Sequence, residues 1–84
     1  MRLRAALRAF SRAENFFPAG DARIDCLPRS LALLQFVRSV GIGAEHCIGV
    51  RRFPFGAHAW VEVAGTVVHD SPAFVRDFHV IART

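Results

Sequence analysis

The spacing of the apolar residues changes at Gly41, and this change limits the chain to folds in which helices precede a sheet. Before Gly41, the residues Leu3, Leu7 and Phe10 recur at helical spacing within residues 2–13, which predicts an amphipathic helix. After Gly41, short segments rich in β-branched and aromatic residues are separated by breaks that contain Pro or Gly. They predict three strands, at residues 44–52, 57–63 and 66–71. The sequence therefore predicts an α+β domain with N-terminal helices packed on an antiparallel β-meander.

A second helix is predicted over residues 26–40, because residues typical of helix ends stand at both of its ends. Asp25 is a preferred N-cap residue, Pro28 falls in the first turn, where a missing N–H is tolerated, and Gly41 suits the position after the last turn. On a helical projection, Cys26 lies on one side together with Leu27, Ser30, Leu33, Leu34, Val37 and Val40. We therefore expect Cys26 at the N-terminus of this helix, on the side that faces the core.

The 84 residues are enough for one domain, which we assign to residues 1–84. Hydrophobic residues make up 52% of the chain, so a packed core is expected. Residues 15–25 read as a loop, because they contain Pro18 and Gly20. For the tail, residues 72–84, the sequence leaves two alternatives, a short helix or a last strand. We expect four of its side chains to close the core: Phe74, Phe78, Val80 and Ile81.

The charge of the chain comes from eleven arginines and gives a net charge of +4, which favours anionic partners. The arginines are scattered and no aromatic stacking motif accompanies them, so nucleic-acid binding is not expected. No apolar run is long enough to span a membrane and no signal peptide is recognisable, so we expect a cytoplasmic protein without a membrane partner. Two cysteines argue against a disulfide framework, although a Cys26–Cys47 bridge stays open.

Cys26 is the first candidate for chemistry. The unpaired N–H groups and the dipole at a helix N-terminus stabilise a thiolate, and the thiolate is the nucleophilic form of cysteine. The same N–H groups would stabilise the oxyanion that forms during acyl transfer. The alternative is a simple buried core cysteine, and for Cys47, in the middle of a predicted strand, that structural role is the expected one.

His58 and Asp70 are the candidate partners of this thiol, and the turn between their strands decides whether they meet. A two-residue turn would pair residue 63 with residue 66 and would put His58 and Asp70 on opposite faces. A three-residue turn with Gly65 in the left-handed conformation would place His58 opposite Asp70, within hydrogen-bonding reach. We expect the three-residue turn. The alternatives are a half-buried strand histidine and an aspartate that begins the turn before Ser71.

Metal binding is the competing chemistry. The possible ligands are Cys26, His46, Cys47, His58, His69 and His79. Their spacing matches no zinc pattern, and adjacent strand residues point to opposite faces, so no metal or other cofactor is expected. A triad centred on Ser71 is not favoured either, because no G-x-S-x-G motif surrounds it.

Several motifs between Asp25 and Ile81 carry a family resemblance. They are Cys26-Leu27-Pro28-Arg29-Ser30, Ile48-Gly49-Val50-Arg51, Pro54-Phe55-Gly56-Ala57-His58-Ala59-Trp60-Val61-Glu62 and Asp70-Ser71-Pro72. In these motifs the chain resembles the transglutaminase-like leader peptidases of lasso-peptide biosynthesis, the B protein or its split B2 form. The resemblance implies a papain-like α+β core, with Cys26 as the nucleophile, His58 as the general base and acid, and Asp70 as the orienting carboxylate.

The resemblance also implies a reaction and partners. The activity would be a cysteine protease that removes the leader from a ribosomally made lasso-peptide precursor. Only 25 residues precede Cys26, so we expect either a small leader-recognition protein of the B1 type that acts in trans or a fused equivalent outside these 84 residues. The lasso cyclase is a further expected partner. Two other functions stay open: acyl transfer to an amine on the same fold, and a non-catalytic module that binds the leader peptide.

Overall fold

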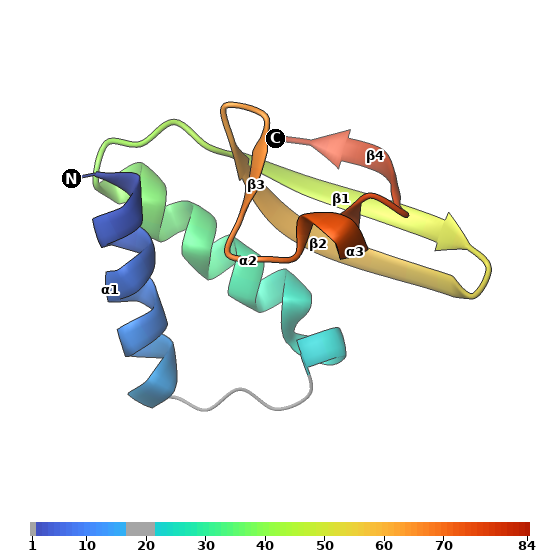
Figure 1. The fold of residues 1–84 in the computed structure, drawn as a ribbon, viewed down its shortest axis with the longest axis horizontal. Helices are drawn as coiled ribbons and strands as arrows, with labels where there is room; N and C mark the ends of the chain where they lie inside the picture. The colour runs from blue at the N-terminus through green and yellow to red at the C-terminus, as the bar shows by residue number, and fades with distance from the viewer. Residues whose placement is uncertain (1, 17–21) are drawn as a thin grey trace.

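The computed structural model describes residues 2–16 and 22–84 and has the expected α+β architecture (Figure 1). Two helices come first, α1 (Leu3–Phe16) and α2 (Ala22–Ser39). The remaining elements are β1 (Glu45–Arg52), β2 (Phe55–Val63), β3 (Thr66–Val68), α3 (Pro72–Val75) and β4 (His79–Arg83). The predicted division of the chain at Gly41 is therefore confirmed.

The sheet has four antiparallel strands in the order β3-β2-β1-β4. The expected meander forms its first three strands, with Cys47 opposite Trp60 and Gly49 opposite His58 in the β1–β2 pair. The tail then runs back along the free edge of β1, where β4 pairs Cys47 with Arg83. The tail contains both elements that the sequence left open, a short helix and a strand.

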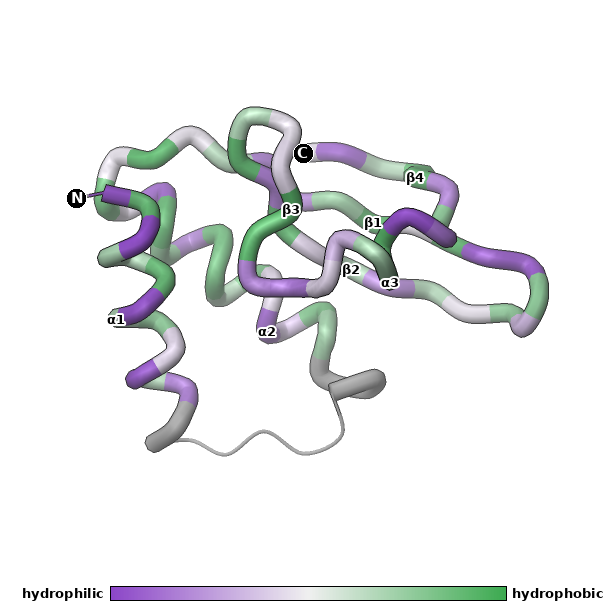
Figure 2. Tube along the Cα trace, in the orientation of Figure 1, coloured by the Kyte–Doolittle hydropathy of each residue, from purple (hydrophilic) through white to green (hydrophobic). Residues whose placement is uncertain are grey.

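Each face of the sheet has its own buried cluster, because successive residues of a strand point to opposite faces. One cluster joins α1 and α2 to β2 and β3, and it consists of Ala6, Leu33, Leu34, Val37, Val61 and Val68. The other lies on the far face with α3, and it consists of Cys47, Trp60, Val75 and Phe78. Figure 2 shows hydrophilic and hydrophobic residues alternating along α1, as expected of a helix with one face on the core.

Gly49 is required where β1 passes beneath Trp60. A Cβ atom at this position would lie 2.7 Å from Cη2 of Trp60 and 3.0 Å from Cβ of Phe78. The first distance is shorter than real Cβ contacts allow, and it is made to a buried ring. The strand can therefore pass under the indole only as glycine.

The predicted helix boundaries need correction. Helix α1 ends at Phe16, and α2 begins at Ala22, so Asp25 is inside the helix instead of at its N-cap. The predicted loop over residues 15–25 is therefore wrong at both of its ends, where the structure has helix. Pro18 and Gly20, on which the prediction rested, lie outside the described residues. The reason is Pro28, which lacks an N–H and removes one helical hydrogen bond but does not prevent helix on its N-terminal side.

The tail closes the core with fewer side chains than expected. Phe78 is buried as predicted, but Phe74, Val80 and Ile81 are 41%, 38% and 64% exposed, so the prediction is wrong for these three. Val75 of α3 is buried in their place. For Val80 and Ile81 the physical reason is that β4 is an edge strand, whose five residues are all exposed. Phe74 lies in the short helix α3, where Val75 is the buried residue.

Candidate active site

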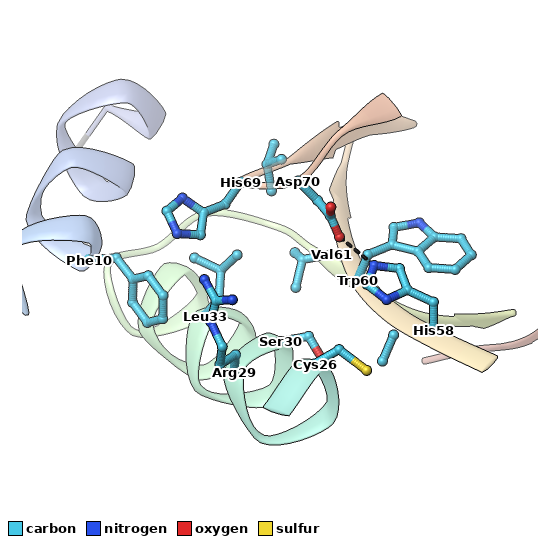
Figure 3. A pocket seen from close by; sticks show the side chains of 12 residues that line it. Phe10, Cys26, Arg29, Ser30, Leu33, His58, Trp60, Val61, His69 and Asp70 are labelled. Atoms are coloured by element: carbon cyan, nitrogen blue, oxygen red, sulfur yellow. Dashed lines mark hydrogen bonds and ion pairs between the residues drawn. The ribbon is translucent and has the colours of Figure 1, made fainter. Parts of the chain in front are cut away.

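A pocket of about 120 Å³ opens between the two helices and the β2–β3 side of the sheet (Figure 3). It is lined by Phe10 of α1, by Cys26, Arg29, Ser30 and Leu33 of α2, by His58, Ala59, Trp60 and Val61 of β2, and by Val68, His69 and Asp70. The three residues singled out from the sequence, Cys26, His58 and Asp70, thus lie on the same pocket. Its volume is close to that of a protein cavity that holds one benzene, about 150 Å³, so it can take one side chain of a substrate.

Cys26 is half-buried, and Figure 3 shows its Sγ on the side of α2 that faces His58. It is the fifth residue of the helix, not the first, because α2 begins at Ala22. The expectation of a thiol at the helix N-terminus is therefore wrong. The effect of a helix dipole falls off within the first turn, so the helix end offers little stabilisation of a thiolate at this position.

His58 and Asp70 form the expected hydrogen bond, with 2.6 Å between Nε2 of His58 and Oδ2 of Asp70. The turn that brings them together is not the predicted one. Val63 pairs with Thr66, so the turn has two residues, Ala64 and Gly65, with φ angles of 52° and 79°. Gly65 has the predicted positive φ, but Ala64 shares it, as in a type I′ turn.

His69 corrects the register that this two-residue turn imposes. Continued pairing would place Ala59, not His58, opposite Asp70. However, β3 ends at Val68, and His69 has a φ of 58°, in the left-handed region. This residue turns the chain out of the ladder, and Asp70 reaches His58 from the segment that follows. The predicted strand over 66–71 is three residues too long for the same reason.

Both partners of this hydrogen bond are held by further contacts. Asp70 accepts a second hydrogen bond at Oδ1 from the backbone N–H of Ser71, at 2.7 Å. The His58 ring stacks on Trp60 at a centroid distance of 5.9 Å and meets the edge of Phe74 at 5.1 Å. With Nε2 bound to Asp70, Nδ1 is the ring nitrogen available for proton transfer with another group. A carboxylate that fixes the tautomer in this way is what a histidine base requires.

A second histidine–carboxylate pair lies at the other end of the pocket, and the sequence did not indicate it. Nε2 of His69 is 2.6 Å from Oε1 of Glu14, and Nε of Arg29 donates to Oε2 of Glu14 at 2.9 Å. Burial opposes ionisation of Glu14, but the hydrogen bonds from Arg29 and His69 outweigh it and hold the pKa of Glu14 below its usual value. Glu14 and His69 are 55 residues apart in sequence, so only the tertiary structure brings them together.

Ser30, which lines the pocket, forms a buried pair with His46, with 2.8 Å between Oγ and Nε2. Burial, and then the charge of Arg38, lower the pKa of His46, so its ring is neutral near pH 7. The hydroxyl of Ser30 donates to the carbonyl of Leu27 at 3.0 Å, so Nε2 of His46 must be the donor to Ser30. Ser30 is thus an anchored hydroxyl rather than an activated nucleophile.

Cys47 lies on the far face of the sheet and is fully buried, as its structural role requires. Burial, and then the negative charge of Glu62, raise the pKa of Cys47 to about 11. Neither cysteine is in a disulfide, and the sheet separates them. Among residues 2–16 and 22–84, no cluster of three His, Cys, Asp or Glu side chains is arranged to hold a metal ion.

No helix in the described part of the chain is long and apolar enough to cross a membrane. Comparison with solved structures gives no match. In sequence, the chain is 47% identical over 75 residues to the microcin J25-processing protein McjB of Escherichia coli. This match covers 89% of the chain but only 36% of McjB, so the chain spans about a third of the length of that relative. Residues 1–83 match the family described as the transglutaminase-like superfamily, and the chain belongs to this family, as its motifs indicated.

Proposed function

We propose that this chain is a cysteine peptidase of lasso-peptide biosynthesis that removes the leader from a ribosomally made precursor peptide. Cys26 is the nucleophile, His58 is the general base and acid, and Asp70 orients His58. The observation that carries this proposal is the 2.6 Å hydrogen bond between His58 and Asp70 on a pocket that Cys26 also lines. The similarity to a microcin-processing protein supports the choice of a peptide precursor as substrate.

The reaction follows from the roles of the three side chains. His58 takes the proton of the Cys26 thiol, and Sγ attacks the carbonyl carbon of the bond between leader and core. The C–N bond then breaks, and His58 returns the proton to the departing amine of the core peptide. Water, deprotonated by His58, attacks the thioester, the C–S bond breaks, and the proton on His58 returns to Sγ of Cys26 as the leader leaves as a carboxylic acid. Asp70 stabilises the imidazolium that forms in each half of the reaction.

The leader is presented by a recognition protein. The pocket holds about one side chain, which is too little contact to bind an extended leader tightly. A partner that grips the leader and docks on this chain raises the local substrate concentration, to about the millimolar range for a short flexible connection. We therefore expect a large partner-dependent gain in cleavage at low substrate concentration, and a smaller gain at saturating substrate.

Mass spectrometry tests the proposal directly. The chain is incubated with a candidate precursor, with and without a leader-recognition protein. The expected products are the free leader acid and a core peptide with a new N-terminal amine. Release of the leader as an amide of an added amine would instead show acyl transfer. Binding of the precursor without any covalent change would show a binding module, and either result would overturn the peptidase assignment.

A further inference from the structure

Two of the three segments that carry the proposed triad share one carboxylate that is not part of it. Glu14 of α1 contacts Arg29 through Oε2 and His69 through Oε1. Arg29 is three residues after Cys26, about one turn further along α2. His69 directly precedes Asp70. One side chain therefore holds both the helix of the thiol and the loop of the orienting carboxylate.

The loop depends on this contact because its backbone conformation is unfavourable. His69 has a φ of 58°, a region that residues other than glycine seldom adopt and that costs about 1 kcal/mol or more. Such a conformation persists only where the surroundings enforce it. The hydrogen bond to Glu14 and an edge contact with the Phe10 ring, at 5.4 Å, both come from α1 and enforce it here.

The ionisation state of Glu14 suits this role. Its carboxylate is 23% exposed, and it faces one arginine and one histidine. The hydrogen bonds from these two groups outweigh the effect of burial, so Glu14 is ionised near pH 7 and accepts from both. A partly exposed ion pair adds little to the free energy of unfolding. Glu14 nevertheless fixes the position of α2 relative to the loop at His69, because it contacts both.

The geometry points to Glu14 as a positioning residue for the proposed reaction, because its carboxylate braces α2 near Cys26 against the His69 turn that aims Asp70 at His58. This inference rests on the proposed function. Neither Glu14 nor its partners exchange protons with the substrate in this role. They set the separation of the groups that do, and a misplacement of about 1 Å in such a site can cost about a hundredfold in rate.

Kinetics of single, double and triple variants test this bracing of α2 against the His69 turn by Glu14, which we call the brace. Glu14→Ala should lower kcat about tenfold to a hundredfold with little change in KM, and Glu14→Gln should recover part of the loss. Arg29→Ala and His69→Ala should each produce part of this loss of kcat. When Glu14→Ala is added to the Arg29→Ala/His69→Ala double variant, kcat should fall by less than about a further twofold. In an Asp70→Asn background, His69→Ala should lose its effect whereas Arg29→Ala should keep it.

Leu3→Ala is the matched control, because Leu3 packs α1 on the same core at the helix end far from Glu14. It should lower Tm at least as much as Glu14→Ala but leave kcat near the wild-type value. An equal loss of kcat in Leu3→Ala, or a full effect of His69→Ala in the Asp70→Asn background, would overturn the brace.

A measurement without turnover separates the two proposals. Histidine ¹H–¹⁵N spectra report the hydrogen bond at Nε2 of His58, and this signal should change in Glu14→Ala but not in Leu3→Ala. If the signal responds and the wild-type chain with its partner cleaves no precursor, the peptidase proposal fails and the brace stands. If the chain cleaves and neither the signal nor kcat responds to Glu14→Ala, the brace fails and the peptidase proposal stands.

Discussion

The two cysteines of this chain lie on opposite faces of one sheet and have opposite surroundings. Cys26 is half-buried on a pocket with His58, whose ring is hydrogen-bonded to the carboxylate of Asp70. Cys47 is fully buried beside the carboxylate of Glu62, and its pKa rises to about 11. Under the proposed function, the neighbours of a thiol, rather than a helix end, decide which cysteine is suited to nucleophilic chemistry. The following predictions test this difference.

Replacement of each thiol should give the largest contrast. Cys26→Ala should abolish cleavage of the precursor while leaving partner binding intact, because only the nucleophile is lost. Cys47→Ala should retain cleavage and lower the stability of the fold through a small buried cavity. Mass spectrometry of the precursor and thermal unfolding of both variants check this. Cleavage by Cys26→Ala would contradict the assigned nucleophile.

Replacement of the carboxylates near each thiol should give the next largest contrast. Asp70→Asn removes the charge that stabilises the imidazolium of His58 and should lower kcat by about 10³- to 10⁴-fold, as the same change does in a serine protease triad. Glu62→Gln beside Cys47 should destabilise the fold, because it weakens the bonds from Trp60 and Arg83, but should lower kcat far less, because Glu62 reaches His58 only through the Trp60 ring. Steady-state kinetics alongside denaturant unfolding measure both effects. Equal losses of kcat would remove the distinction between the two carboxylates.

Alkylation should separate the two thiols in the folded protein. At a given pH below 9, the raised pKa of Cys47 reduces its thiolate about a hundredfold relative to a thiol of the ordinary value 9.0, and burial slows the reagent further. Limiting iodoacetamide, read by peptide mapping, should therefore modify Cys26 first. In denaturant the two cysteines should react at similar rates, which serves as the control. Equal labelling of the folded protein would count against the assignment.

Alkaline titration should give the smallest effect. The folded-state pKa of Cys47 is raised above 9.0 to about 11, so the neutral thiol contributes stability that is fully present below pH 9. This contribution, about 3 kcal/mol, should be lost as the pH rises through 11, because the unfolded chain ionises first. Denaturant unfolding between pH 8 and 11 should show this decline in the wild type and a smaller one in Cys47→Ala. Parallel curves for the two proteins would refute it.

Much of the fold follows from local sequence patterns. The strands over residues 44–52 and 57–63 and the apolar face of α2 have clear periodicity, and the structure confirms them except at Leu27, which was expected on the core side and is 46% exposed. The start of α2 was misplaced because Asp25 and Pro28 resemble a helix start, although a helix can continue on the N-terminal side of a proline.

The contact between His58 and Asp70 was predicted through a turn that does not occur. Ala64 and His69 both adopt positive φ angles that neither residue type favours, and only the surrounding tertiary contacts select such conformations. The Glu14 contacts were missed for a related reason, because they join α1 to residues 15 and 55 positions away. No local pattern carries that information.

The absence of a side chain at Gly49 sets how the site can vary under mutation. Every amino-acid substitution there adds at least a Cβ, which would lie 2.7 Å from the Trp60 ring, and His58 stacks on that same ring. A change in β1 would thus displace the indole and the imidazole together, although Gly49 does not line the pocket. A larger residue at position 49 therefore requires a compensating change at Trp60, which single-site mutagenesis does not supply. Libraries that aim to alter the pocket should vary both positions or neither.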